Sequence, residues 1–252
     1  MEKPTEEAKP SAKPSAKAEK KTKTMERVKT GINGLDELLM GGVPTRKHVA
    51  LYGGPGTGKT SFGFEFIYQG AKMGENGVYI SFEESPEDIV GNMKSTFPKM
   101  DDIDSLVKAG KMEVLKPAKL ELEDLVELLK KKVKSNNVKR LVIDSATMIE
   151  MSFKSDLEYR RSLFDFLTFL RKLDLTSMMI VESPTSKKEQ MRYGLEHFIM
   201  DGIINLYSVS MEEKSVRSLE VFKMRGTDHS RDLVPYKVTP TGMKIYVGEK
   251  VF

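Results

Sequence analysis

The residues with the clearest chemistry run from Gly53 to Thr60 and read Gly-Gly-Pro-Gly-Thr-Gly-Lys-Thr, a full match to the pattern GxxxxGK[ST]. In such a loop the backbone N–H groups surround phosphate oxygens, the lysine reaches the β- and γ-phosphates, and the last hydroxyl joins a Mg²⁺ shell. The lysine of this loop is Lys59, and the last hydroxyl belongs to Thr60. An apolar run, residues 48–52, precedes the loop and a helical pattern follows it, as a strand–loop–helix site requires. The sequence therefore predicts binding of a nucleoside triphosphate.

The whole loop supplies candidate binding residues, because its glycines permit a tight backbone path around the phosphates. The residues expected to contact the nucleotide are Gly54, Pro55, Gly56, Thr57, Gly58, Lys59, Thr60 and Ser61. A glycine-rich turn without special meaning is the alternative. The complete match between a strand and a helix favours the phosphate site.

A second candidate is Asp144, which ends the apolar run Leu141-Val142-Ile143. Open α/β sheets place their ligands at the carboxyl tips of strands, so an aspartate there can hold Mg²⁺ through water, beside Thr60. A strand-end aspartate without this role is the alternative. Its place roughly 85 residues after the phosphate loop favours the metal role.

Glu83 and Glu84 follow the first strand expected after the phosphate loop. A carboxylate in this position can lie over the γ-phosphate and orient an attacking water. Adjacent residues of an extended chain point in different directions, so we expect one catalytic and one supporting carboxylate. Glu83 is the first choice, and Glu84 can equally serve the N-terminus of the next helix.

Lys223 and Arg225 end a predicted strand and, being two residues apart, share one of its faces. Two cations on one face repel each other unless an anion or a neighbour offsets them. One interpretation is a pair that enters the nucleotide site of a neighbouring subunit and stabilises charge on the transferred phosphoryl group. The other is a solvated basic strand edge. Spacing alone favours the solvated edge.

The elements that must position these residues alternate between strands and helices, as in a mostly parallel sheet covered on both faces. Helices are expected over residues 61–73, 120–134 and 157–173, and a further one is expected to begin at Pro86 after an N-capping Ser85. Strands are expected over residues 78–82, 112–115, 141–143 and 178–181. Four more strands, residues 203–209, 219–223, 233–238 and 243–247, follow without intervening helices and predict an antiparallel extension.

Composition and charge favour a single globular domain over residues 25–252. Of 252 residues, 39% are apolar and 31% charged, and no run approaches the ~18 apolar residues of a membrane helix. The sequence has no cysteine, which excludes disulfides and thiolate metal sites but does not fix the compartment. No signal-peptide core follows Met1, and together with the expected nucleotide binding this leads us to expect a cytoplasmic protein.

The basic character gathers in the first 24 residues. This segment holds seven lysines and four glutamates, which leaves the rest with +1 of the net charge of +4. It has no aromatic or branched apolar residue, so it is expected to be a disordered tail. A nearly neutral body argues against a nucleic-acid partner.

Several segments in order resemble the KaiC family of RecA-type ATPases, and the resemblance covers about nine-tenths of the chain. The segments that carry it are residues 27–36, 41–44, the phosphate loop, 82–89, 142–145 and 223–229. It implies an α/β fold with a RecA-like P-loop NTPase core, a mostly parallel twisted sheet flanked by helices, and a C-terminal antiparallel strand extension.

The resemblance also implies a hexameric ring with ATP and Mg²⁺ between subunits. The paired glutamates would activate water, Lys223 and Arg225 would act in trans, and Ser95, Thr227 and His229 would lie near the base or the phosphates. A single-domain chain of this kind predicts an archaeal source. The resemblance further implies that residues 196–199 correspond to a segment that is autophosphorylated in the two-domain member of the family. This segment contains no hydroxyl here, so we expect no autokinase activity at that site.

Three functions compete. The leading hypothesis is a slow, Mg²⁺-dependent ATPase with a regulatory or signalling role, partnered by copies of itself and by an unknown regulatory protein. The second is a DNA-handling motor that would use Lys187, Lys188 and Arg192. Against it stands an aromatic-poor segment, since single strands usually need stacking platforms. The third is an ATP-gated scaffold with little hydrolysis.

Overall fold

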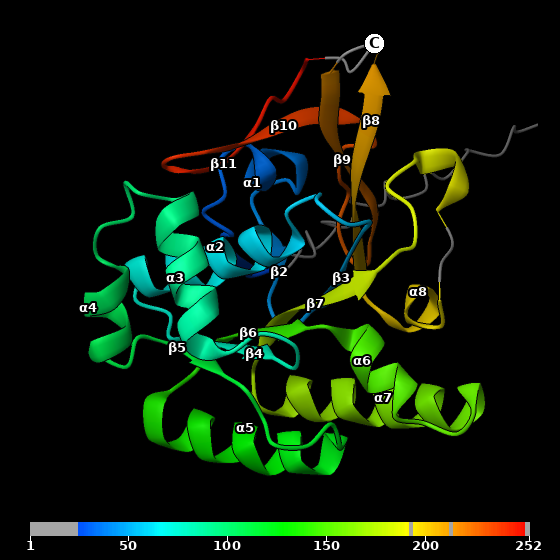
Figure 1. Ribbon diagram of the computed structural model, residues 1–252. Coiled ribbons are helices and arrows are strands. Elements are labelled where there is room, and N and C mark those ends of the chain that lie inside the picture. The colour runs from blue at the N-terminus through cyan, green and yellow to red at the C-terminus, as the bar shows by residue number, and fades with distance from the viewer. Residues whose placement is uncertain (1–24, 192–193, 212–213, 250–252) are drawn as a thin grey trace, which may run out of the picture.

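The computed structural model describes residues 25–191, 194–211 and 214–249 (Figure 1). The predicted disordered tail, residues 1–24, and the candidate DNA-contacting Arg192 lie outside the described residues.

A nine-stranded mixed sheet runs through the described part of the chain, in the order β11-β10-β9-β8-β3-β7-β6-β4-β5. Its strands are β3 (His48–Gly53), β4 (Gly77–Ser81), β5 (Met112–Leu115), β6 (Arg140–Asp144), β7 (Thr176–Glu182), β8 (Gly202–Met211), β9 (Lys214–Met224), β10 (Val234–Thr239) and β11 (Gly242–Ile245). Strands β8, β3, β7, β6, β4 and β5 are parallel, and β9, β10 and β11 continue the sheet in antiparallel fashion. The predicted fold class is confirmed.

Helices cover both faces of the sheet, because successive strand residues point to opposite sides. Val49 and Leu51 of β3 face one core, whereas Ala50 and Tyr52 face the other. The first core is completed by α1 (Leu35–Leu38), α2 (Lys59–Lys72), α3 (Pro86–Thr96) and α4 (Ile103–Lys108). The second is completed by α5 (Leu122–Asn136), α6 (Ala146–Met151), α7 (Asp156–Lys172) and α8 (Glu196–Ile199), of which α5 and α7 lie along the bottom of Figure 1.

Most predicted elements agree with the structure to within two or three residues. The capping prediction is confirmed, since the Ser85 hydroxyl accepts the backbone N–H of Asp88 and Pro86 is the first residue of α3. The short helices α1, α4, α6 and α8, the two-stranded sheet of β1 (Arg27–Val28) and β2 (Val43–Pro44), and the 3₁₀ turn η1 (Lys188–Gln190) were not predicted. Four to six residues hold too few turns for a periodic pattern.

The change of strand direction comes one strand later than expected. Strand β8, predicted as the first strand of the antiparallel extension, is parallel to β3 and antiparallel only to β9. A parallel neighbour requires the chain to return to the starting edge of the sheet. The stretch from β7 through η1 to α8 makes this return along the right of Figure 1.

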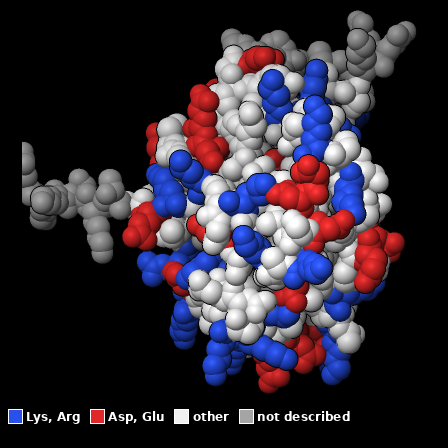
Figure 2. Space-filling model, turned by 90° about the vertical axis from the view of Figure 1, so that its left-hand side faces the viewer, with Lys and Arg blue, Asp and Glu red and all other residues white. Residues whose placement is uncertain are grey.

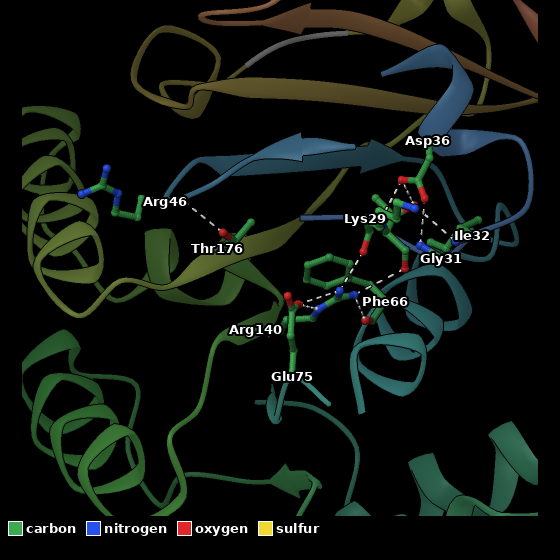
Figure 3. Close-up of polar contacts among 10 residues, drawn as sticks. Lys29, Gly31, Ile32, Asp36, Arg46, Phe66, Glu75, Arg140 and Thr176 are labelled. Carbon is green, nitrogen blue, oxygen red and sulfur yellow. Dashed lines mark hydrogen bonds and ion pairs between the residues drawn. The ribbon is translucent and has the colours of Figure 1, made fainter. Parts of the chain in front are cut away.

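Arg140, the first residue of β6, joins three separate segments on the side of the sheet that α2 covers (Figure 3). Its guanidinium is 1% exposed and donates to the carbonyl oxygens of Lys29 (2.7 Å) and Phe66 (2.9 Å) and to the Glu75 carboxylate (2.7 Å). It also lies over the Phe66 ring, 4.7 Å from the centroid. The N-terminal strand segment, α2 and the core of the sheet therefore meet at one side chain.

Helix α2 approaches Arg140 closely because residue 70 is glycine. A Cβ at Gly70 would lie 2.3 Å from the Arg140 Cδ, and one at Gly63 would lie 2.9 Å from a Val142 methyl. Both contacts are tighter than side chains permit, so the two glycines set how near α2 lies to β6.

A second buried contact ties α2 to the C-terminal hairpin of β10 and β11. The Glu65 carboxylate, 2% exposed, accepts the backbone N–H of Met243 at 2.6 Å. Burial raises the pKa of Glu65 to about 7, although the bonds from Met243 and Gln69 act in the opposite direction.

None of the helices in the described part of the chain has the length and apolar character that crossing a lipid bilayer demands.

Replacing Arg140 by methionine is expected to lower the free energy of unfolding by about 3–5 kcal/mol, because buried carbonyls lose their donor and Glu75 loses its partner. Glu75→Gln keeps the guanidinium and its backbone bonds, and Glu75 is partly exposed, so it should cost about 1 kcal/mol or less. Urea unfolding followed by circular dichroism measures both values. Equal losses in the two variants would contradict the central role of Arg140.

The elevated pKa of Glu65 makes stability depend on pH. Between about 4.5 and about 7 the folded chain keeps a proton that the unfolded chain has lost. The resulting stabilisation is present below pH 4.5 and is lost as pH rises through 7, a contribution of about 3 kcal/mol.

Glu65→Gln keeps a hydrogen-bond acceptor without the charge. The variant should therefore be more stable than the wild type at pH 8 and nearly equal to it at pH 5. Glu127→Gln, an exposed charge change on α5, controls for the loss of one carboxylate. Parallel stability curves for the wild type and Glu65→Gln across this range would show that Glu65 is not the source.

Candidate functional site

Four neighbouring parallel strands end together at one edge of the sheet, here called the phosphate edge. The strand register pairs Gly53 of β3 with Glu182 of β7, and Ser81 of β4 with Asp144 of β6. The phosphate loop leaves β3 at this edge, and Glu83 follows β4. The edge therefore gathers the loop and three acidic side chains that are far apart in the sequence.

The phosphate loop opens into the N-terminus of α2. Gly56 and Gly58 have φ angles of +75° and +85°, a backbone region that favours glycine. A Cβ at Gly56 would meet nothing within 4 Å, whereas one at Gly54 would lie 2.2 Å from the Ser186 hydroxyl. One side of the loop is thus open and the other is backed by protein.

Lys59, the first residue of α2, folds back over its own loop. Its Nζ donates to the Gly54 carbonyl at 3.2 Å, and the Thr57 hydroxyl donates to the same carbonyl at 2.8 Å. Burial lowers the pKa of Lys59, and the carboxylates of Glu182, Asp144 and Glu83 act against this, in that order. The lysine is held where a triphosphate would lie.

Thr60 and Asp144, the two predicted metal ligands, are in direct contact. The Thr60 hydroxyl donates to Asp144 Oδ2 at 3.1 Å, and the Tyr79 hydroxyl donates to the same oxygen. Burial raises the pKa of Asp144, while the two hydroxyl donors and Lys59 lower it. Asp144 is therefore placed beside Thr60 as the predicted metal shell requires.

Glu83 and Glu84 have different surroundings. The Glu84 carboxylate accepts a bond from Asn92 of α3 at 3.0 Å, and its backbone N–H donates to the Ser81 hydroxyl. Burial raises the pKa of Glu83, and the charges of Glu182 and Asp144 raise it further. Both carboxylates therefore have charged neighbours at the phosphate edge, since Glu84 also acts on Asp144, but Glu84 is in addition hydrogen-bonded to α3.

Lys223 and Arg225, here called the distal cation pair, lie at the opposite end of the sheet. The Arg225 N–H donates to the Asp201 carbonyl, and the Asp201 N–H donates to the carbonyl of His48, the first residue of β3. The phosphate loop begins at Gly53, about 16 Å further along the strand at ~3.3 Å per residue. The pair cannot reach the phosphate loop of its own chain.

The distal cation pair rests on the end of α8. Lys223 Nζ donates to the carbonyl oxygens of His197 (2.9 Å) and Met200 (2.8 Å), and an Arg225 guanidinium nitrogen donates to Phe198 O (2.9 Å). The Arg225 side chain is exposed, and the groove beside it, about 510 Å³, is lined by Leu157, Phe164 and Phe198 among others. Both cations face away from their own phosphate edge.

The remaining predicted binding residues also lie away from the loop of their own chain. The Thr227 hydroxyl accepts from Arg27 at 2.5 Å, and His229 Nδ1 lies 2.9 Å from the Ser230 carbonyl. Ser95 is in the last turn of α3 and donates to Gly91 O. The contacts printed for these three residues are with other parts of the same chain, and their binding roles stay predictions.

Residues not predicted from the sequence complete the surroundings of the loop. Glu182 is the last residue of β7 and lies beside Gly53. Arg217 of β9 donates from Nε to the Gly56 carbonyl at 3.1 Å, and Tyr236 of β10 donates to the Thr57 carbonyl. Glu182 carries the same strand-tip signal as Asp144, whereas Arg217 and Tyr236 reach the loop only through the fold of the antiparallel strands.

The arrangement fits a triphosphate with a magnesium ion. The open loop offers backbone N–H groups and Lys59 to the phosphates, and Thr60 and Asp144 offer oxygen ligands to the metal. Within the described residues there is no group of three or more His, Cys, Asp or Glu side chains that could hold a metal. This fits an ion that takes part of its shell from phosphate and water.

Comparisons with known proteins show what this chain is similar to. The family model of the KaiC ATPase matches residues 28–250. A UPF0273 protein of Thermotoga maritima is 36% identical, covering 89% of this chain and 98% of its own length. A UPF0273 protein of Pyrococcus horikoshii is 35% identical, covering 87% and 94%.

Two further comparisons concern KaiC itself and a solved structure. The circadian clock oscillator protein KaiC of Synechococcus elongatus is 31% identical over 87% of this chain, which spans 44% of the clock protein. The crystal structure of a KaiC-like protein from Pyrococcus horikoshii superposes with a TM-score of 0.77 at 35% identity, covering 88% of this chain and 99% of that one. Relatives occur in bacteria and archaea, so the archaeal source stays a prediction.

Asp144→Asn should weaken the Mg²⁺-dependent part of ATP binding by about 10–100-fold, because the amide keeps the shape but loses the charge that orients the metal shell. Binding of a fluorescent ATP analogue, titrated with Mg²⁺ and with a chelator, measures this part separately. Asp165→Asn, an exposed change on α7, is the control. An unchanged Mg²⁺ dependence in Asp144→Asn would exclude Asp144 as a metal ligand.

Proposed function

Because the chain belongs to the KaiC ATPase family, we propose that it hydrolyses ATP slowly, with Mg²⁺, at boundaries between copies of itself. One observation carries the proposal: the distal cation pair is at the opposite end of β3 from the phosphate loop of the same chain. A phosphoryl-transfer site normally combines such a loop with a cation at the transferred group. A neighbouring chain can supply that cation.

The phosphate loop holds the triphosphate and Lys59 neutralises its β- and γ-phosphates. Glu83 orients a water molecule at the γ-phosphorus and takes its proton as the new P–O bond forms. The bond from the γ-phosphorus to the bridging oxygen breaks, and ADP leaves with that electron pair. Desolvation and the charges of Glu182 and Asp144 raise the pKa of Glu83, which makes its carboxylate a stronger base.

Thr60 and Asp144 would hold the magnesium ion. Bound there, it would neutralise charge on the β- and γ-phosphate oxygens. Glu84 would support Glu83 by fixing the turn between β4 and α3 through Asn92 and Ser81.

The neighbouring chain would contribute Lys223 and Arg225 to the γ-phosphate, with Thr227, His229 and Ser95 near the nucleotide at the same boundary. Each chain then offers a loop at one end and cations at the other. Such a head-to-tail contact generates a closed ring when its rotation closes. A hexamer is the ring size that the family resemblance predicts.

The family match takes up residues 28–250, so the ATPase forms the body of this sequence. We propose that the nucleotide state of the ring is its output and that a regulatory protein responds to it. The cytoplasm, where ATP is available, remains the predicted location.

The contacts of Lys188 disfavour a DNA-handling motor. Lys188 forms an ion pair with Glu220 and lies over the Tyr207 ring, so its charge is already matched. Figure 2 shows the opposite side of the molecule, with α3 and α4, and there too cationic and anionic side chains are interspersed. Clustered cations would be expected on a surface that tracks a nucleic-acid backbone.

Two variants separate the halves of the proposed site. Glu83→Gln removes the base and keeps the cations, whereas Lys223→Ala/Arg225→Ala removes the cations and keeps the loop. Each alone should lower phosphate release from radiolabelled ATP by 100-fold or more, on the order of an arginine-finger loss. In an equal mixture of the two, about one quarter of random boundaries would pair an intact loop with intact cations.

Phosphate release by the mixture should therefore recover to about a quarter of the wild-type rate. Lys108→Ala, an exposed cation on α4, controls for the change of charge. A mixture as inactive as its components, or a fully active cation variant, would rule out catalysis across the boundary. Undetectable hydrolysis by the wild type, with ATP still assembling the chains, would favour the ATP-gated scaffold.

A further inference from the structure

The Tyr79 hydroxyl is a buried polar group that the proposed mechanism does not use. Tyr79 lies in the middle of β4 and is fully buried, and its hydroxyl donates to Oδ2 of Asp144 at the end of the neighbouring β6. A Cβ at Gly63 of α2 would lie 3.3 Å from the Tyr79 ring, so the glycine leaves room for that ring beneath the helix. Tyr79 therefore reaches the proposed metal ligand from the core of the protein.

Two hydroxyl groups share one oxygen of the Asp144 carboxylate. Oδ2 accepts the Thr60 hydroxyl at 3.1 Å and also the Tyr79 hydroxyl. A carboxylate oxygen has about two lone-pair positions, so these donors fill Oδ2. The Thr60 oxygen can donate its proton to Asp144 and still offer its own lone pairs to a metal. Tyr79 is thus the donor that closes Oδ2 to direct coordination.

A second buried contact between tyrosines and a carboxylate has a different arrangement. Tyr52 donates to Oε2 of Glu196, and Tyr159 donates to Oε1, so each oxygen accepts one hydroxyl. Glu196 is fully buried, whereas Asp144 is partly exposed at the tip of its strand. The pairing of both donors on one oxygen is therefore particular to the carboxylate at the phosphate edge.

This arrangement treats Mg²⁺ and Ca²⁺ differently. Mg²⁺ requires nearly ideal octahedral geometry and keeps several of its waters, to which a single carboxylate oxygen can be an acceptor. Ca²⁺ takes more oxygen ligands and often binds both oxygens of one carboxylate. Binding through both oxygens of Asp144 would require Oδ2 to give up the Tyr79 bond. The site therefore suits Mg²⁺ and denies Ca²⁺ a bidentate ligand.

We propose that Tyr79 is a positioning residue that confines Asp144 to one available oxygen and thereby makes the nucleotide site prefer Mg²⁺ to Ca²⁺. This inference rests on the proposed function for the metal role of Asp144. Tyr79 acts through Asp144 and is not itself a metal ligand.

The test compares the affinity of the full chain for a fluorescent, non-hydrolysable ATP analogue under saturating Mg²⁺ and under saturating Ca²⁺. The wild type should bind the Mg²⁺ complex more tightly. Tyr79→Phe keeps the ring and removes the hydroxyl, so it should lower the ratio of the Mg²⁺ to the Ca²⁺ affinity by about tenfold, as expected when a metal ligand loses its supporting bond. Tyr159→Phe loses the same kind of bond at Glu196 and should leave the ratio unchanged.

A wild type that binds the two complexes equally tightly would overturn the inference without any variant. An unchanged ratio in Tyr79→Phe, with a wild-type circular dichroism spectrum, would also overturn it, as would equal losses for the two metals. Failure of the proposed metal site gives a different result, because Asp144→Asn would then keep the wild-type ratio. If both proposals hold, adding Tyr79→Phe to Asp144→Asn changes the ratio no further.

Discussion

The position of the nucleotide-binding helix depends on one buried cation, Arg140. Its guanidinium binds the backbone of the N-terminal segment at Lys29, the backbone of α2 at Phe66, and Glu75 beyond the end of α2. A buried charge without partners is costly, so these three groups must stay in place together. Arg140 starts β6 and Asp144 ends it. The strand that holds α2 in position at one end therefore carries the proposed metal ligand at its other end.

Contacts from the phosphate loop and from the N-terminal half of α2 then hold the loop against the antiparallel strands. Glu65 binds Met243 of β11, Tyr236 of β10 binds the Thr57 carbonyl, and Arg217 of β9 binds the Gly56 carbonyl. Of these strands, β9 carries Arg217 and also leads at its end into the distal cation pair. The antiparallel extension thus links a phosphate loop to the cations that its own chain would offer to a neighbour.

Structural features that depend on a short stretch of sequence could be predicted. The phosphate loop, the strand that ends at Asp144 and the capped start of α3 all depend on residues within about ten positions of one another. Glu182 could have been predicted in the same way as Asp144, because it also ends an apolar strand. No motif next to it in the sequence indicates a role. Its place beside the phosphate loop depends on pairing with Gly53, which is a property of strand order.

Other parts of the site depend on contacts that no local pattern records. The Tyr79 bond to Asp144 and the Arg217 bond to Gly56 arise from the order in which strands join the sheet. The distance between the distal cation pair and the phosphate loop has the same origin: β8 turned out to be parallel to β3, which places the end of β9 level with the start of β3. Spacing alone could not distinguish a basic edge from a pair directed at another chain.

The close approach of Gly70 to Arg140 has an evolutionary consequence. No side chain fits at position 70 while an arginine fills the space below it, and no shorter residue at position 140 would keep the three segments joined. Either substitution made first passes through a destabilised intermediate, so descendants of this chain can leave the pair only by exchanging both positions nearly together. The two positions should therefore change together in evolution, even though neither lies at the phosphate edge.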